Sequence, residues 1–182
     1  MPLTGNKTIS LLIELALVLG LAVATALSAE VKIGIGIIPI TLQTLVVLLS
    51  GILFGSRTGA AAQAAYLLGG LAGIPWFAAG GGLAYLLSPT FGYIAGFVVA
   101  AYITGLLAEN GWAKNSISAA GAMAAGNAVI YIFGALWLAK YMPLSGALAI
   151  GVYPFLAGDA LKIGAAASAM ALVRSISRFG RV

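Results

Sequence analysis

The amino-acid sequence predicts an all-α integral membrane protein with six transmembrane helices. Hydrophobic residues make up 62% of the 182 residues and charged residues only 7%, against roughly half and a quarter in soluble domains. A soluble fold of this length has too little interior to bury so much apolar surface, whereas a bilayer solvates it. The 25 glycines fit the same class, because glycine lets membrane helices approach one another closely.

Six apolar runs approach the length of roughly 20 residues that crosses the hydrocarbon core. Glycine, proline and polar residues separate the runs and interrupt helices. We expect a single domain over residues 1–182, with helices at about 8–28, 39–55, 58–73, 90–108, 116–139 and 152–174. The first run also resembles a cleavable signal peptide, because Lys7 precedes it and Ala24-Thr25-Ala26 ends it. Glu14 within that run and the further apolar runs after it favour a membrane helix.

The basic residues orient the predicted helices. An even number of helices places both termini on the same side, and basic residues are enriched in cytoplasmic loops. A cytoplasmic N-terminus leaves two basic residues outside, Lys32 and Lys140, and Lys162 within a span. The same orientation places six inside: Lys7, Arg57, Lys114, Arg174, Arg178 and Arg181. We therefore predict a protein of the cell membrane with both termini in the cytoplasm. This distribution explains the net charge of +5 better than a nucleic-acid partner does.

The composition also excludes several kinds of chemistry. The chain has no Cys and no His, which rules out disulfides, thiolate or imidazole metal sites, and the usual catalytic dyads with those residues. We expect no catalytic residues, no metal and no cofactor. The sequence contains no phosphate-binding loop of the kind that hydrolyses ATP, so an energy source for active transport must lie in another protein.

Asp159 and Lys162 are the leading candidates for a binding site. They lie inside an apolar segment, where a charge costs roughly 2.5–3.5 kcal/mol, and their spacing puts both on one helix face. In the predicted orientation they fall in the outer third of the last helix, which suits capture of a solute from outside. The alternatives are an ion pair that only fixes helix packing, or a lysine that reaches to the membrane interface.

Further candidates are polar or aromatic residues within the predicted helices or beside their outer ends, with Asn127 near the middle of the fifth helix and Tyr131 one turn later. Gln43, Asn127 and Tyr131 could bind a ligand, or hydrogen-bond neighbouring helices together. The uncharged segment 74–89 is either a cover over the site or a flexible glycine-rich connector. Within or beside it, Trp76, Tyr85 and Tyr93 could line an apolar pocket, although such residues also anchor helix ends at the interface.

Small residues form a stripe along the first predicted helix, at Ala16, Gly20 and Ala24. Such stripes allow another helix to pack closely. The sequence leaves open whether that helix belongs to this chain or to a separate protein.

Several of these motifs, taken in order, resemble the BioY family of biotin transporters. The resemblance covers about residues 12–174. It rests on Pro39-Ile-Thr-Leu-Gln-Thr-Leu, Phe54-Gly55, Arg57 and Gly59, Gly73-Ile-Pro, the glycines at 80–82, Ser88-Pro-Thr-Phe-Gly-Tyr-Ile-Ala-Gly-Phe, Ile130-Tyr, Gly134, Trp137-Leu, and Gly158-Asp-Ala-Leu-Lys. It implies a six-helix S component of an energy-coupling factor transporter, which binds biotin with high affinity near the outer face. The partners that it implies are a transmembrane coupling protein and two ATPases of the ABC type, although some members occur without a dedicated module. In the family the small-residue stripe, here Ala16 and Gly20, contacts the coupling protein.

Two departures from the family pattern affect the expected site. Some members carry an Asn where this chain has glycines at 80–82, and an Arg where it has Ile94. Lys162 is then the cation expected to neutralise the biotin carboxylate, with Asp159 orienting it or accepting a ureido N–H. Alternatives are an S component for thiamin or riboflavin, a solitary vitamin facilitator, a membrane-embedded enzyme, and a purely structural subunit.

Overall fold

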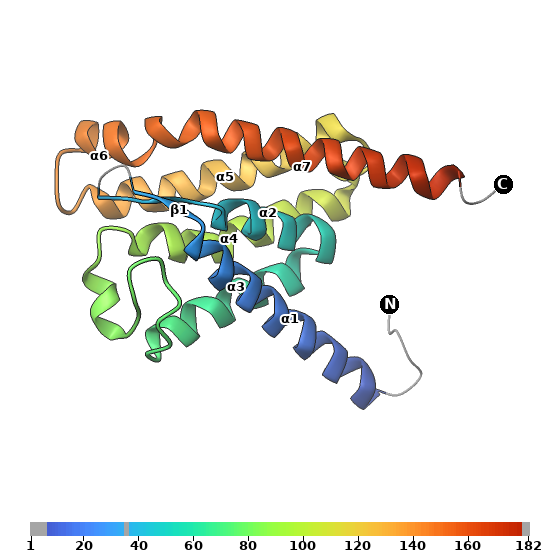
Figure 1. Cartoon of the computed structure of the whole chain (residues 1–182), viewed down its shortest axis with the longest axis horizontal. Coiled ribbons are helices and arrows are strands. Elements are labelled where there is room, and N and C mark those ends of the chain that lie inside the picture. Colours follow the sequence, from blue (N-terminus) through green and yellow to red (C-terminus); the bar gives the residue numbers. More distant parts are fainter. Residues whose placement is uncertain (1–6, 35–36, 180–182) are drawn as a thin grey trace.

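The computed structural model describes residues 7–34 and 37–179, with side chains as far as Leu172. The described residues form seven α-helices, two short helices of other types and a two-stranded hairpin (Figure 1). The elements in chain order are α1 Lys7–Glu30, β1 Lys32–Ile33, β2 Ile40–Thr41, α2 Gln43–Phe54, α3 Ser56–Leu71, the 3-10 helix η1 Leu83–Leu87, α4 Phe91–Leu107, the π-helical turn η2 Ala108–Trp112, α5 Ser116–Leu138, α6 Leu144–Gly151 and α7 Tyr153–Phe179.

Helix α4 is the centre of the bundle and packs against α2, α3 and α5. Helix α7 lies along α5, and α1 contacts α3 and α2 through its C-terminal half (Figure 1). The first half of α1 leans away from the other helices in this view. The two remote helix ends, the start of α1 and the end of α7, lie on the same side of the molecule, opposite α6.

Glycines bring the central helices into close contact. A Cβ atom on Gly59 of α3 would lie 2.8 Å from the Cα of Gly51 on α2. A Cβ on Gly105 of α4 would overlap the backbone of Ser56 at the start of α3. Larger side chains at these positions would force the helices apart, which is why the high glycine content is compatible with a well-packed bundle.

The outer surface confirms a helical membrane protein. Four helical stretches among the described residues are long and apolar enough to cross a bilayer: Lys7–Glu30, Phe91–Trp112, Ser116–Leu138 and Leu144–Leu172. Large apolar side chains project from the bundle, including Leu11 at 65% exposure and Leu161 at 76%. Lipid solvates such side chains where water would not. Helix α2, with 12 residues, is only about 18 Å long and falls short of the hydrocarbon thickness.

Two expectations about the helices need correction. Helix α2 begins at Gln43 rather than near residue 39, because Ile40 and Thr41 form β2 and pair with β1. The segment before the last long helix was expected to be a loop, but it contains α6, which ends just before α7 begins. Of the basic residues that were used to orient the chain, Arg181 lies outside the described residues, as do the side chains of Arg174 and Arg178.

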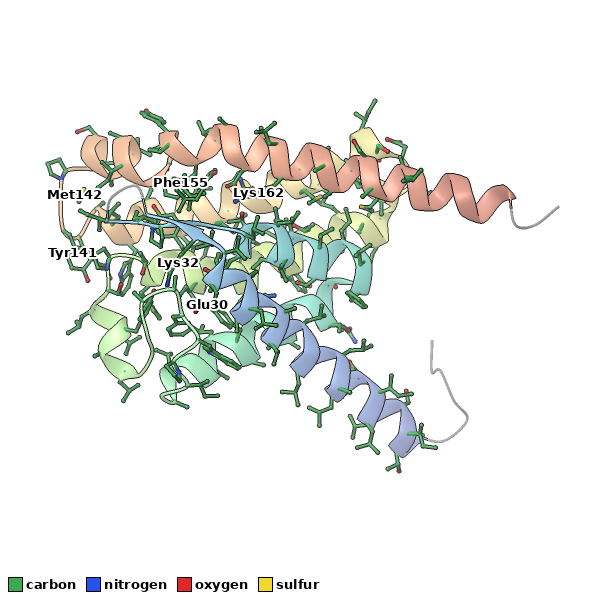
Figure 2. The ribbon with its side chains drawn as sticks, in the orientation of Figure 1. Glu30, Lys32, Tyr141, Met142, Phe155 and Lys162 are labelled. Carbon is green, nitrogen blue, oxygen red and sulfur yellow. The ribbon has the colours of Figure 1, made fainter. Side chains whose placement is uncertain are left out.

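The segment between α3 and α4 is a packed cover rather than a loose connector. Phe77 is 2% exposed and forms a bridge with Gly80, and Tyr85 on η1 is 6% exposed. The ring of Phe77 fills the space beside Gly70 on α3. Lys32, labelled in Figure 2, donates a hydrogen bond of 3.0 Å from Nζ to the carbonyl of Ala78 and so joins the hairpin to this segment. We refer to residues 74–89 as the cover.

Candidate functional site

A cavity lies between the hairpin, the cover and helices α4, α5 and α7. Its volume is about 120 Å³, on the order of ten times the space that admits one water molecule. The apolar part of its wall consists of Ile37, Ile38, Pro39, Ala78, Ala79, Ile94, Phe97, Ile130 and Phe155. The polar part consists of Thr41, Gln43, Thr44, Tyr85, Ser88, Thr90, Tyr93, Tyr131, Asp159 and Lys162. The tyrosine rings add to the apolar surface of the wall. An apolar wall surface with convergent polar groups is typical of a small-molecule site.

The carboxylate of Asp159 accepts four hydrogen bonds. Oδ1 accepts from Lys162 Nζ at 2.7 Å and from Thr44 Oγ1 at 3.0 Å. Oδ2 accepts from Asn127 Nδ2 at 3.0 Å and from Tyr131 at 2.5 Å. These donors come from α2, α5 and α7, so the carboxylate holds three helices together. Its side chain is only 5% exposed, and without such partners burying this charge would be strongly unfavourable.

Lys162 uses its three N–H groups within the protein. Besides Asp159, its Nζ donates to the carbonyl of Thr41 at 2.7 Å and to Thr44 Oγ1 at 3.1 Å. The Thr41 carbonyl points to Lys162 because residues 40–41 are extended rather than helical. Figure 2 shows Lys162 and Phe155 on the side of α7 that faces the rest of the bundle. An added carboxylate would have to displace one of these three acceptors to pair with Lys162.

The structure brings most of the expected site residues to the cavity. Six of the eight line its wall: Gln43, Tyr85, Tyr93, Tyr131, Asp159 and Lys162. Asn127 instead lies behind Asp159, next to a groove between α5 and α7. Trp76 lies against α3, where its indole N–H donates to the carbonyl of Tyr66 at 2.9 Å. These two residues support the cavity from behind rather than forming its wall.

Sequence analysis missed a cluster of hydroxyl groups at the start of α4. Thr90 Oγ1 lies 2.8 Å from the hydroxyl of Tyr85 and 2.8 Å from that of Ser88. Burial raises the pKa of the Tyr85 hydroxyl, so Tyr85 stays neutral at physiological pH. All three side chains line the cavity. Ser88 and Thr90 belong to the sequence motif that begins at Ser88, but their spacing does not distinguish them from residues that cap a helix.

Ile94, an apolar residue, also lines the cavity wall. In the described wall, Lys162 is the one cationic side chain and Asp159 the one anionic side chain. Because these two neutralise each other, the cavity has no net charge and is suited to a ligand with a large apolar part.

Ala16 and Gly20 lie far from the cavity, on an exposed face of α1. A Cβ on Gly20 would have no atom within 4 Å among the described residues. The buried residues of α1 are Ala22, Thr25, Ser28 and Ala29, all in its second half. The small-residue stripe therefore does not pack against the other described helices.

The helical membrane fold and the enclosed polar site define a membrane-embedded protein with a pocket for a small molecule. Comparison with known proteins then gives the family: residues 4–179 match the model of the BioY family. This chain belongs to the BioY family.

Related proteins agree with this assignment. A probable biotin transporter BioY of Pyrococcus horikoshii is 36% identical over 138 residues, which are 75% of this chain and 81% of the relative. The biotin transporter BioY of Thermotoga maritima is 37% identical over 139 residues, with the same coverage of 75% and 81%. The fold matches a crystal structure of the S component for biotin from an ECF-type ABC transporter, with a TM-score of 0.81, 23% identity and 95% coverage of both chains.

Proposed function

We propose that this chain is the biotin-binding S component of an energy-coupling factor transporter and mediates biotin uptake. The observation that carries the proposal is the buried Asp159–Lys162 network in the wall of a cavity with otherwise uncharged lining residues, in a member of the BioY family. Biotin has an apolar bicyclic ring, a ureido group rich in hydrogen-bonding atoms, and a carboxylate at the end of a hydrocarbon chain. A mostly apolar cavity with polar groups on several walls suits such a molecule.

In the proposed site, Asp159 and Lys162 hydrogen-bond one polar group of biotin. Gln43 and Tyr131 hydrogen-bond further polar atoms, and Tyr85 and Tyr93 contact the rings. Asn127 acts by holding Asp159, and Trp76 acts by holding the cover. Since the N–H groups of Lys162 are already engaged, binding of the biotin carboxylate at Lys162 requires an exchange of partners there.

We further propose that residues 1–182 form one domain with six spans, namely α1 to α5 and α7, and with both termini in the cytoplasm. The basic residues support this orientation, and so does the position of the start of α1 and the end of α7 on the same side (Figure 1). The site then lies near the outer face of the cell membrane. Helices α2 and α3 are short for spans, and the hairpin and the cover extend the protein beyond their outer ends.

The proposed partners are a transmembrane coupling protein and two ABC-type ATPases. The exposed stripe at Ala16 and Gly20 is the proposed contact with the coupling protein, because it is unoccupied by the described helices of this chain. Small residues there would allow a partner helix to approach closely.

The test is calorimetric titration of the purified chain in detergent with biotin, beside Lys162→Ala. We expect one-to-one binding that Lys162→Ala weakens by about 3–5 kcal/mol, because Asp159 is left as a buried charge without its counter-ion. Lys140→Ala is the matched control, since Lys140 is exposed and stacks on Trp137 at 3.4 Å. Near-native affinity of Lys162→Ala would refute the site.

A second variant separates binding from folding. Asp159→Asn combined with Lys162→Met removes both charges, so we expect its thermal unfolding to return toward that of the wild type while biotin binding stays weak. If the wild-type protein releases heat with thiamin or riboflavin but not with biotin, the assignment of biotin as the ligand is wrong, and the assignment to the S components still holds.

A further inference from the structure

Tyr66 lies outside the cavity wall and yet connects two parts of the site. Its side chain is completely buried in α3. The hydroxyl accepts a hydrogen bond of 2.7 Å from Nε2 of Gln43 and donates one of 3.2 Å to the main-chain carbonyl of Trp76. Gln43 lines the cavity and Trp76 belongs to the cover. One hydroxyl group therefore joins a cavity-lining side chain to the segment that closes the cavity.

The chemistry of the partners fixes the direction of these bonds. A carbonyl oxygen can only accept, so the O–H of Tyr66 must point to Trp76, and only the Tyr66 oxygen remains for Gln43. Gln43 must therefore turn its NH₂ group toward Tyr66. On the other side, Oε1 of Gln43 accepts from Thr41 Oγ1 at 3.2 Å. The Thr41 hydroxyl can donate or accept, so this contact is compatible with the amide orientation that Tyr66 requires. The Tyr66 contact therefore determines which end of the amide is oxygen and which is nitrogen.

The same chain of contacts reaches the ion pair. The main-chain carbonyl of Thr41 accepts from Lys162 at 2.7 Å, and Lys162 pairs with Asp159 at 2.7 Å. Thr41 therefore contacts both the ion pair and Gln43. A continuous set of hydrogen bonds runs from Lys162 of α7 through Thr41 of β2 and Gln43 of α2 to α3 and on to the cover.

Tyr66 also supports the cover in ways that do not involve its hydroxyl. Its carbonyl accepts from the indole of Trp76 at 2.9 Å. Its ring lies 5.5 Å from that of Trp76 and 5.2 Å from that of Phe77, between centroids. Replacement of Tyr66 by phenylalanine can keep these contacts, so it separates the role of the hydroxyl from the packing of the cover.

We propose that Tyr66 is a positioning residue, which orients the Gln43 amide for the ligand and links it to the cover. This inference rests on the proposed function, because it assigns Gln43 to ligand binding. When Gln43 is held with its NH₂ group toward Tyr66, the free hydrogen-bonding capacity of the amide is presented to the cavity in a single orientation. Without the Tyr66 hydroxyl, the amide can rotate, and the Trp76 carbonyl loses its side-chain donor.

The test compares Tyr66→Phe with Tyr102→Phe, a control on α4 that is 45% exposed, by titration with biotin. We expect Tyr66→Phe to weaken binding about tenfold, as for a lost buried hydrogen bond, and Tyr102→Phe to bind as the wild type does. Each change is also made in a Gln43→Ala background, where Tyr66→Phe should have no further effect. Unchanged affinity of Tyr66→Phe, or the same loss with and without Gln43, would overturn the positioning role.

Hydrogen exchange on the ligand-free proteins distinguishes failure of this inference from failure of the proposed function. Absence of binding by the wild type overturns the biotin proposal, and with it the role of Tyr66 toward biotin. Whether or not the wild type binds biotin, Tyr66→Phe and Gln43→Ala should each speed amide exchange at residues 76–82. In this part of the cover the backbone N–H groups donate within the cover and to Gly70. Exchange as slow as in the wild type in both variants would overturn the link between Gln43 and the cover.

Discussion

At Gly69 and Gly70, missing side chains make room for the aromatic rings of the cover. A Cβ on Gly69 would overlap the ring of Trp76, and one on Gly70 would overlap that of Phe77. Phe77 in turn packs against Tyr85, with 4.5 Å between ring centroids. The wall of the cavity at Tyr85 therefore depends on two glycines that do not touch the cavity.

Gly70→Ala should loosen the cover. The added methyl group cannot fit unless Phe77 moves, and overpacking of this kind costs about 1–3 kcal/mol. We expect a lower unfolding temperature in detergent and weaker biotin binding. Gly20→Ala is the matched control, because nothing lies within 4 Å of its added Cβ. Equal unfolding temperatures for the two variants would show that the cover is not held at this position.

Among the elements, the start of α3 depends on a side chain from η2, the π-helical turn that follows α4. Oε1 of Glu109 accepts from the backbone N–H of Ser56 at 2.7 Å and from its hydroxyl at 3.0 Å. The turn between α2 and α3 passes through Gly55 at φ +88°, a conformation that favours glycine. A carboxylate there satisfies an N–H group that has no partner within the helix and interacts favourably with the helix dipole.

Glu109→Ala should therefore destabilise the α2–α3 turn. We expect a loss of about 1 kcal/mol, as for other helix caps, seen as a lower unfolding temperature with little change in biotin affinity. Glu14→Ala, on an exposed face of α1, should leave the unfolding temperature unchanged. A Glu109→Ala protein as stable as the wild type would mean that solvent replaces the cap.

The buried residues by which α1 packs against the other described helices all lie in its second half. Thr25 and Gln63 share a buried hydrogen bond of 3.2 Å, and Gln63 also donates to Ser50 of α2 at 3.3 Å. These polar contacts hold three helices together where the first half of α1 leaves the bundle (Figure 1). The exposed half is the part of the molecule most accessible to a partner helix.

Bulky residues on α1 should block transport without affecting binding. Ala16→Phe and Gly20→Phe each place a large ring on the exposed stripe of small residues and leave the cavity unchanged. We therefore expect normal biotin binding by titration, but loss of ATP-driven uptake in cells that express the coupling proteins. Leu11→Phe, exposed on the opposite face of α1, is the control. Loss of biotin binding would instead place the stripe inside the folded core of this chain.

For the molecule as a whole, the apolar surface and the buried ion pair are those of a binding subunit that lies in the membrane. The cavity is closed off by the cover and the hairpin, and the sequence contains no ATP-binding loop of the kind found in transport ATPases. Under the proposed function, movement of biotin against a gradient depends on the coupling protein and the ATPases.

Vesicles that contain only this chain should bind biotin but not accumulate it. Uptake of radiolabelled biotin above the external concentration should appear only when the coupling protein, the ATPases and ATP are added. Rapid equilibration of biotin across vesicles of the isolated chain would favour a solitary facilitator instead.

The membrane class, most helix boundaries and the Asp159–Lys162 pair could be predicted from the sequence. These features are local: apolar length defines a span, and an i, i+3 spacing brings two side chains to one helix face. The motifs in their order also identified the family, which the comparisons confirmed. The count of six spans and their orientation stay predictions.

The groups that complete the site could not be predicted from the sequence, because they come together through packing. Thr44 and Asp159 are 115 residues apart in the chain and meet through packing of α2 against α7. Thr41 reaches Lys162 because it leaves the expected helix to pair with β1, and Trp76 turns to α3 because glycines provide the space. Contacts between distant segments depend on the competition among all packing arrangements, which spacing along one helix does not encode.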